Sequence, residues 1–140
     1  FESGILERNS VEADLLIILS DVKGLYRADP KLDTTAELIP LVRKITNEIE
    51  TMAGDSKSTI GVGGMVTKIQ AAKRLSLSGI PTVIVDGKMK GIIEAVTGGE
   101  DVGTLFLSEE DKLGSKKYWI AYTLKSKGKI WMFLFLCLRK

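Results

Sequence analysis

The chain has 140 residues, with 20 Lys or Arg and 18 Asp or Glu, so its formal net charge at pH 7 is +2. This near balance gives no reason to expect bulk attraction to nucleic acid or to a membrane. The lack of histidine excludes His-based acid–base catalysis and most catalytic zinc sites. Cys137 is the only cysteine, which excludes an intrachain disulfide and favours a reducing, cytoplasmic location.

The first half of the chain predicts a buried strand, a long loop and a short helix. Residues 13–20 form a continuous apolar run, typical of a fully buried, parallel strand. Residues 21–33 are polar and predict a long loop, which is often functional. Residues 37–45 fit either a second strand or an irregular segment, and Pro40 favours a sheet edge. Residues 47–53 predict a helix capped by Thr46 or Asn47.

The second half continues the alternation of helix and strand. A helix is expected from Gly64 to about Gly79, which suits a position just after the helix end. Its apolar face consists of Met65, Ile69, Ala72 and Leu75. A buried strand over 81–86, a helix over 91–97 and a strand over 103–107 follow. This alternation predicts an α/β layered fold with a largely parallel sheet.

The glycine-rich segment that leads into the 64–79 helix is the strongest functional signal. Glycines at 61, 63 and 64 allow the backbone to approach a ligand closely. The free N–H groups of the first helical turn then form a favourable site for phosphate. Lys68 in that turn opposes the helix dipole, with no acidic residue beside it, and a phosphoanion would compensate for this. The alternative without a function is an ordinary glycine-rich turn with an exposed lysine.

Parallel topology brings a second feature to the same place. Helices that connect parallel strands begin at the carboxyl edge of the sheet, where ligands of open α/β sheets bind. Ser20 and Asp21 follow the first buried strand, so they should meet the 61–68 segment at this edge. The sequence therefore predicts a phosphate-binding site there.

The segments 20–30 and 61–68 together resemble the bacterial glutamate 5-kinase branch of the amino acid kinase family. The resemblance runs from about Val11 to Ile130 and includes residues 52–55, 68–72 and 102–106. It implies ATP-dependent phosphorylation of the L-glutamate γ-carboxylate, the first step of proline biosynthesis. It also implies that Mg²⁺ arrives with the nucleotide, and that the enzyme is a homo-oligomer. Neither a membrane nor a nucleic acid is an expected partner.

The resemblance also implies site residues. Ser20 and Asp21 match a pair that contacts the nucleotide, and Tyr26 and Asp29 match a loop near the adenine. Lys68 matches the catalytic lysine that neutralises charge on the transferred phosphoryl group. The loop around the phosphates corresponds to Val62, Gly63, Gly64, Met65, Val66, Thr67 and Lys68. Four of these residues have a purely structural alternative: Ser20 as a strand end, Asp21 and Asp29 as turn caps, and Tyr26 as a cover for the core.

The implied fold is a three-layer α-β-α sandwich of the amino acid kinase type. Residues 1–107 match only its C-terminal, nucleotide-binding half, and residues 108–140 match a linker and the truncated start of a PUA-like domain. Residues 1–10 and 131–140 depart from the family pattern, and its glutamate-binding half is absent from the 140 residues. We therefore expect a fragment that is inactive alone.

Three alternatives to a glutamate kinase remain open. The chain could belong to another member of the amino acid kinase family, or be a non-catalytic remnant that binds nucleotide. It could also bind RNA through residues 116–130, where lysines alternate with aromatic residues. The apolar run 130–138 is expected to promote aggregation or chain–chain association, with docking on the kinase-like part as the alternative.

Overall fold

The computed structural model describes residues 13–55, 64–109 and 130–134. Its strands and helices are, in chain order, β1 (Leu15–Ser20), β2 (Leu41–Val42), α2 (Asn47–Asp55), α3 (Met65–Ser76), β3 (Thr82–Asp86), α4 (Ile92–Thr97), β4 (Thr104–Phe106) and β5 (Ile130–Leu134). Within this described part of the chain, no helix is long and apolar enough to cross a membrane.

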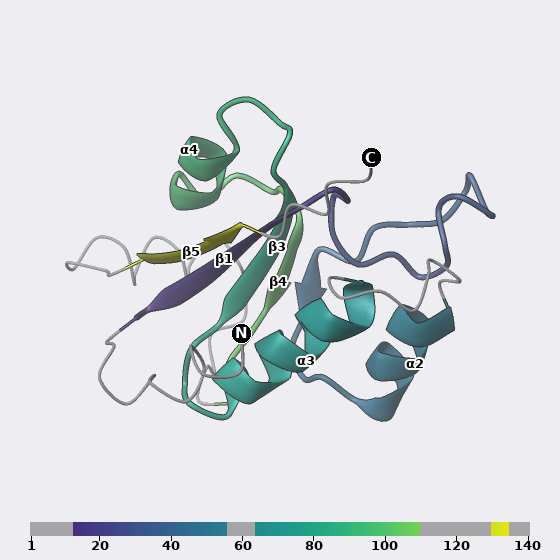
Figure 1. Ribbon diagram of the computed structural model, residues 1–140, viewed down its shortest axis with the longest axis horizontal. Helices are drawn as coiled ribbons and strands as arrows, with labels where there is room; N and C mark the ends of the chain where they lie inside the picture. The colour runs from purple at the N-terminus through teal and green to yellow at the C-terminus, as the bar shows by residue number, and fades with distance from the viewer. Residues whose placement is uncertain (1–12, 56–63, 110–129, 135–140) are drawn as a thin grey trace.

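The strands form one sheet in the order β2-β4-β3-β1-β5 (Figure 1). β1 is parallel to both of its neighbours, β3 and β5, and β2 is parallel to β4. Helices α2 and α3 lie together on one side of the sheet and α4 lies on the other (Figure 1). The three α-β-α layers and the largely parallel sheet of the sequence-based prediction are therefore confirmed. The edge position predicted from Pro40 is also correct, because β2 is an outer strand.

One strand direction departs from the parallel pattern, since β4 runs antiparallel to β3. The connection between the two strands carries the six-residue helix α4, which covers about 9 Å, roughly half the length of β3. After it the chain re-enters the sheet in the opposite direction.

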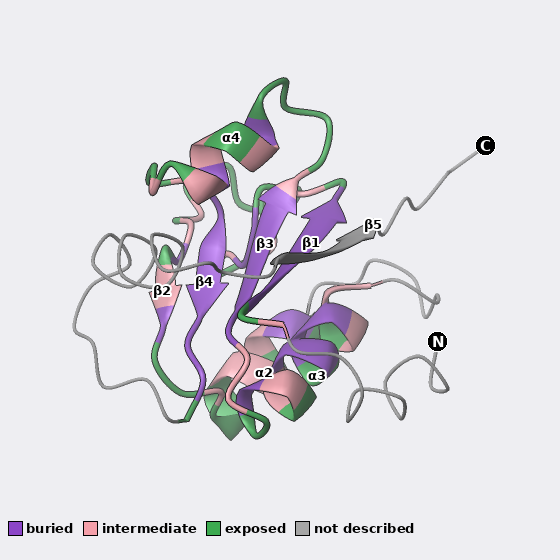
Figure 2. Cartoon of the chain, turned by 90° about the vertical axis from the view of Figure 1, so that its left-hand side faces the viewer, coloured by how far each residue is buried: buried purple, intermediate pink, exposed green. Residues whose placement is uncertain are grey.

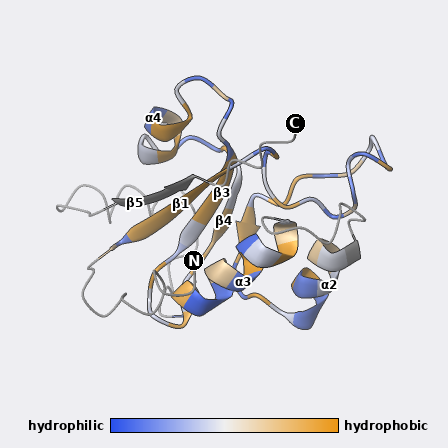
Figure 3. Cartoon of the chain, viewed as in Figure 1, coloured by the Kyte–Doolittle hydropathy of each residue, from blue (hydrophilic) through white to orange (hydrophobic). Residues whose placement is uncertain are grey.

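The buried strands separate two apolar layers (Figures 2 and 3). Along β1, Leu15, Ile17 and Leu19 belong to the cluster that includes Ile92 and Val96 of α4. The alternate residues Leu16 and Ile18 belong to the opposite cluster, with Ile69 and Ala72 of α3. This alternation places both faces of β1 in a core, which is why its sequence is a continuous apolar run.

The helix boundaries follow the predicted capping signals closely. α2 begins at Asn47 with Thr46 as its cap, since the Ile49 N–H donates to Thr46 Oγ1 at 3.5 Å. The helix predicted to reach Gly79 ends earlier, at Ser76, because a turn intervenes. In that turn the Ile80 N–H donates to the Leu75 carbonyl at 3.0 Å, and Gly79 takes the left-handed conformation with φ of 75°. The predicted apolar face of α3 is confirmed, since its four residues pack in one cluster.

The C-terminal apolar run contributes β5 to the same sheet. Residues Leu15 to Leu19 of β1 are in register with Ile130 to Leu134. Residues 130–134 thus dock on the kinase-like part. Docking was the alternative outcome, whereas aggregation or chain–chain association was the favoured expectation. The linker over 108–129 lies almost wholly outside the described residues, and the predicted domain boundary after residue 107 stays a prediction.

Candidate nucleotide site at the carboxyl edge of the sheet

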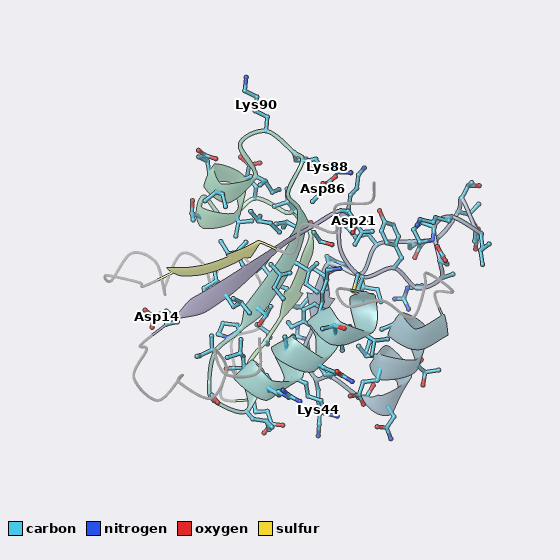
Figure 4. The ribbon with its side chains drawn as sticks, viewed as in Figure 1. Asp14, Asp21, Lys44, Asp86, Lys88 and Lys90 are labelled. Carbon is cyan, nitrogen blue, oxygen red and sulfur yellow. The ribbon has the colours of Figure 1, made fainter. Side chains whose placement is uncertain are left out.

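Ser20 and Asp21 lie where β1 ends, as the sequence predicts. Ser20 is 4% exposed and is in register with Asp86, the last residue of β3. Its hydroxyl donates to Asp21 Oδ1 at 3.3 Å and accepts from the Val22 N–H at 3.3 Å. Its carbonyl accepts from the Gly87 N–H at 2.8 Å. Asp21 itself is exposed, and Figure 4 shows its side chain at the same edge as Asp86 and Lys88, with Asp14 at the opposite end of β1.

Helix α3 begins at this same edge. It packs on one face of the sheet and leads into β3. Its N-terminus therefore lies near the carboxyl ends of the parallel strands β1 and β3. Its cap residue is Gly64, which has no side chain that could cap the helix. The first turn of α3 holds no acidic residue. The backbone N–H groups of Met65, Val66 and Thr67 precede the first intrahelical donor, because the Lys68 N–H is the one that reaches the Gly64 carbonyl, at 3.3 Å.

The Lys68 side chain is the unusual feature of α3. Only 3% of the residue is exposed, although the sequence alone allowed an exposed and therefore inexpensive lysine. Burying an ammonium group is costly unless polar or charged groups surround it. Lys68 does interact within the folded chain. The cation is therefore held in place in the folded protein, which suits a group that must meet an anion in a fixed geometry.

The loop over residues 21–39 separates β1 from β2 and carries the other two predicted residues. Tyr26 is half-buried and forms an isolated antiparallel bridge with Leu38. Asp29 caps a turn, since its Oδ1 accepts from the Lys31 N–H at 2.9 Å. The structural alternative for Asp29, a turn cap before Pro30, is thus realised. Its role near an adenine stays a prediction, as does that of Tyr26.

The tip of this loop contains a carboxylate with a shifted pKa. Thr35 donates to Asp33 Oδ1 through its hydroxyl at 2.6 Å and its backbone N–H at 2.9 Å. These two hydrogen bonds favour the ionised form and hold the pKa of Asp33 below its ordinary value. The stabilisation is therefore present at neutral pH and is lost as the pH falls through this lowered pKa.

Thr35→Ala should raise the pKa of Asp33 toward its ordinary value, because the stronger of the two donors is removed. Titration of the side-chain carboxyl carbon by NMR measures this directly. An unchanged Asp33 titration would show that the hydroxyl has no effect on this carboxylate in solution.

The structure thus describes some residues of the predicted site, and others lie outside its described residues. Ser20, Asp21 and the start of α3 lie at one sheet edge, whereas Val62 and Gly63 lie outside the described residues. Tyr26 and Asp29 belong to the adjoining loop. Among the residues that the structure describes, no group of three or more Asp, Glu, Cys or His side chains is placed to hold a metal ion.

Sequence reasoning missed Thr104, whose hydroxyl bonds to both ends of the loop between β1 and β2. It donates to the Ile39 carbonyl at 2.6 Å and accepts from the Leu25 N–H at 2.9 Å. In the sequence, the segment around Thr104 stood out only as a predicted strand over 103–107 and as part of the family resemblance. No local pattern identifies the bonding partners of Thr104, which lie 65 and 79 residues away along the chain.

Comparison with known proteins agrees with this arrangement. The profile of the amino acid kinase family matches residues 9–86, more than half of the chain, and the chain belongs to this family. Glutamate 5-kinase from Trichlorobacter lovleyi is 56% identical over 119 residues, which are 85% of this chain and 32% of that protein. Glutamate 5-kinase from Pelobacter propionicus is 50% identical over 125 residues, which are 89% of this chain and 34% of that protein.

The chain therefore spans about a third of the length of the relatives that it matches. Among solved structures, UMP kinase from Bacillus anthracis aligns with a TM-score of 0.50 and 15% sequence identity, over 79% of this chain and 41% of that one. At this identity the similarity supports the fold alone.

Proposed function

We propose that this chain forms the ATP-binding part of a glutamate 5-kinase, which transfers a phosphoryl group from ATP to the γ-carboxylate of L-glutamate. The observation that carries the proposal is that the end of β1 and the start of α3 lie at the same edge of the sheet, in a chain similar to two glutamate 5-kinases. The proposed homo-oligomer and cytoplasmic location rest on the same resemblance.

The residues at the edge have complementary roles in this proposal. The N–H groups of Met65, Val66 and Thr67 bind phosphate oxygens, since the helix dipole gives them partial positive charge. The Lys68 ammonium stabilises the charge that develops on the transferred phosphoryl group. Ser20 and Asp21 offer a hydroxyl and a carboxylate on the nucleotide side of the same edge.

The donor set at the start of α3 suits the phosphates of ATP, because it combines N–H groups and a cation in a first turn that holds no acidic residue. Mg²⁺ would come with the nucleotide and screen the charge of its phosphates. Asp21 is the exposed carboxylate at this edge and is the residue best placed to approach a nucleotide-bound cation.

Lys68→Ala should weaken binding of MgATP, which carries the transferred phosphoryl group, by about 10–100-fold, since a hydrogen bond to a charged group contributes about 1.5–3 kcal/mol. Isothermal titration calorimetry of the 140-residue chain measures the affinity. Lys73→Ala on the same helix is the matched control, because Lys73 lies in the last turn and pairs with Glu50 of α2 at 2.9 Å. Its loss should leave the affinity unchanged.

Equal affinity for MgATP in the wild type and in Lys68→Ala would remove Lys68 from the phosphate site. Thermal unfolding of each variant without nucleotide separates a binding effect from a folding defect, because Lys68 is buried. Absence of MgADP binding by a folded wild type would contradict the proposed function itself.

A further inference from the structure

The 21–39 loop is closed at its base by a short pair of antiparallel segments. The Arg27 N–H donates to the Glu37 carbonyl at 3.0 Å, and the Ile39 N–H donates to the Leu25 carbonyl at 2.8 Å. Leu25 and Ile39 are both buried in the apolar cluster beneath α3. The base of the loop is therefore fixed to the core, while Asp33 at its tip is exposed.

Thr104, the first residue of β4, joins the two sides of this base. Its hydroxyl accepts from the Leu25 N–H at 2.9 Å and donates to the Ile39 carbonyl at 2.6 Å. Thr104 is 0% exposed, so both backbone groups are bonded away from water. Removing the hydroxyl would leave a buried donor and a buried acceptor without this partner, which is costly.

Two glycines make room for this contact. Gly24 has φ of 154°, and a Cβ there would lie 2.5 Å from Thr104 Oγ1. Gly103 has φ of 66°, and a Cβ there would collide with the Ile84 carbonyl oxygen. A side chain at either position would therefore disturb the close approach of the loop to β4.

A second buried threonine shows what is particular to Thr104. Thr82, on the neighbouring strand β3, is also 0% exposed. Its hydroxyl has no hydrogen-bond partner within the described residues. The two threonines share one sheet and one degree of burial, but of the two only the Thr104 hydroxyl bonds to two backbone groups of the loop base.

We infer that Thr104 is a positioning residue for the nucleotide site. Its hydroxyl fixes the base of the 21–39 loop, and thereby the placement of Asp21 and Tyr26 on either side of Gly24. This inference rests on the proposed function, because it assigns the loop to nucleotide binding. Thr104 acts through the loop and needs no contact with the nucleotide itself.

The test compares three variants of the 140-residue chain by two measurements. Thr104→Val removes the hydroxyl at nearly constant shape, Thr104→Ser restores it, and Thr82→Val is the matched control. The first measurement is hydrogen exchange at the Leu25 amide, which needs no ligand. The second is the affinity for MgADP by calorimetry, at a temperature where each variant is folded by circular dichroism.

Thr104→Val should speed exchange at Leu25 at least tenfold and weaken MgADP binding about three- to tenfold. Thr104→Ser should return both values toward those of the wild type, and Thr82→Val should change neither. Should Thr104→Val fail to fold, Thr104→Ala takes its place with the same expected changes, and an MgADP affinity of Thr104→Ala equal to that of Thr104→Ser overturns the inference.

A purely structural role predicts a different pattern, in which Thr104→Val lowers the melting temperature but leaves the MgADP affinity of the folded chain unchanged. That result overturns the inference and leaves the proposed function standing. Failure of the folded wild type to bind MgADP overturns the proposed function, and the nucleotide role of Thr104 with it. Unchanged exchange at Leu25 would in addition show that the hydroxyl does not fix the loop.

Discussion

A chain shortened to end at Lys129 should be less stable than the full chain by roughly 3–5 kcal/mol. The truncation removes β5, whose five residues are in register with Leu15 to Leu19 of β1. Each net backbone hydrogen bond contributes about 1 kcal/mol. A loss of this size is a large part of the stability of a typical domain, about 5–15 kcal/mol. Urea unfolding followed by circular dichroism measures the difference.

The shortened chain should also associate. Without β5, the strand β1 becomes a sheet edge that is apolar on both faces, and such an edge is a template for pairing with another chain. Sedimentation velocity would show this as species larger than a monomer. A chain that ends at Leu134 is the control, because it keeps β5 and lacks only residues 135–140. Equal stability of the two shortened chains would show that β5 does not support β1 in solution.

Much of this fold could be predicted because its core elements carry strong local patterns. The apolar run of β1 and the period of α3 are set by burial, and burial selects the residue types directly. The antiparallel direction of β4 was not predicted, although the helix before it was placed correctly up to Thr97, because the alternation of helix and strand carries no signal for strand direction. The position of β5 depends on pairing with β1 across more than a hundred residues, so the same apolar run fits aggregation as well as docking.

The candidate site could also be predicted only in part. Ser20 and the start of α3 could be placed together because parallel topology brings strand ends and helix starts to one edge. The burial of Lys68 was not predictable, since it depends on how α3 packs and not on its own spacing. The hydrogen bonds from Thr104 to the loop base could not be predicted either, because a hydroxyl that bonds to distant backbone groups leaves no periodic pattern in the sequence.

Glutamate-dependent ATP turnover by the 140-residue chain alone should lie at least about a thousandfold below a typical kinase rate of about 1–100 s⁻¹. The chain covers about a third of the length of the glutamate 5-kinases that it matches. The resemblance places the glutamate-binding half of the family's fold outside the 140 residues. Loss of even one group that stabilises a transition state costs about 10²–10³ in rate.

A coupled assay of ADP release, with and without L-glutamate, makes this measurement, and the full-length Trichlorobacter lovleyi relative provides the positive control. The wild-type chain should bind MgADP in calorimetry while its ADP release stays at the level of Lys68→Ala. Binding without turnover fits both an ATP-binding part and a non-catalytic remnant, whereas absence of binding excludes both. Glutamate-dependent turnover near the rate of the relative, abolished by Lys68→Ala, would show that these 140 residues assemble a complete substrate site.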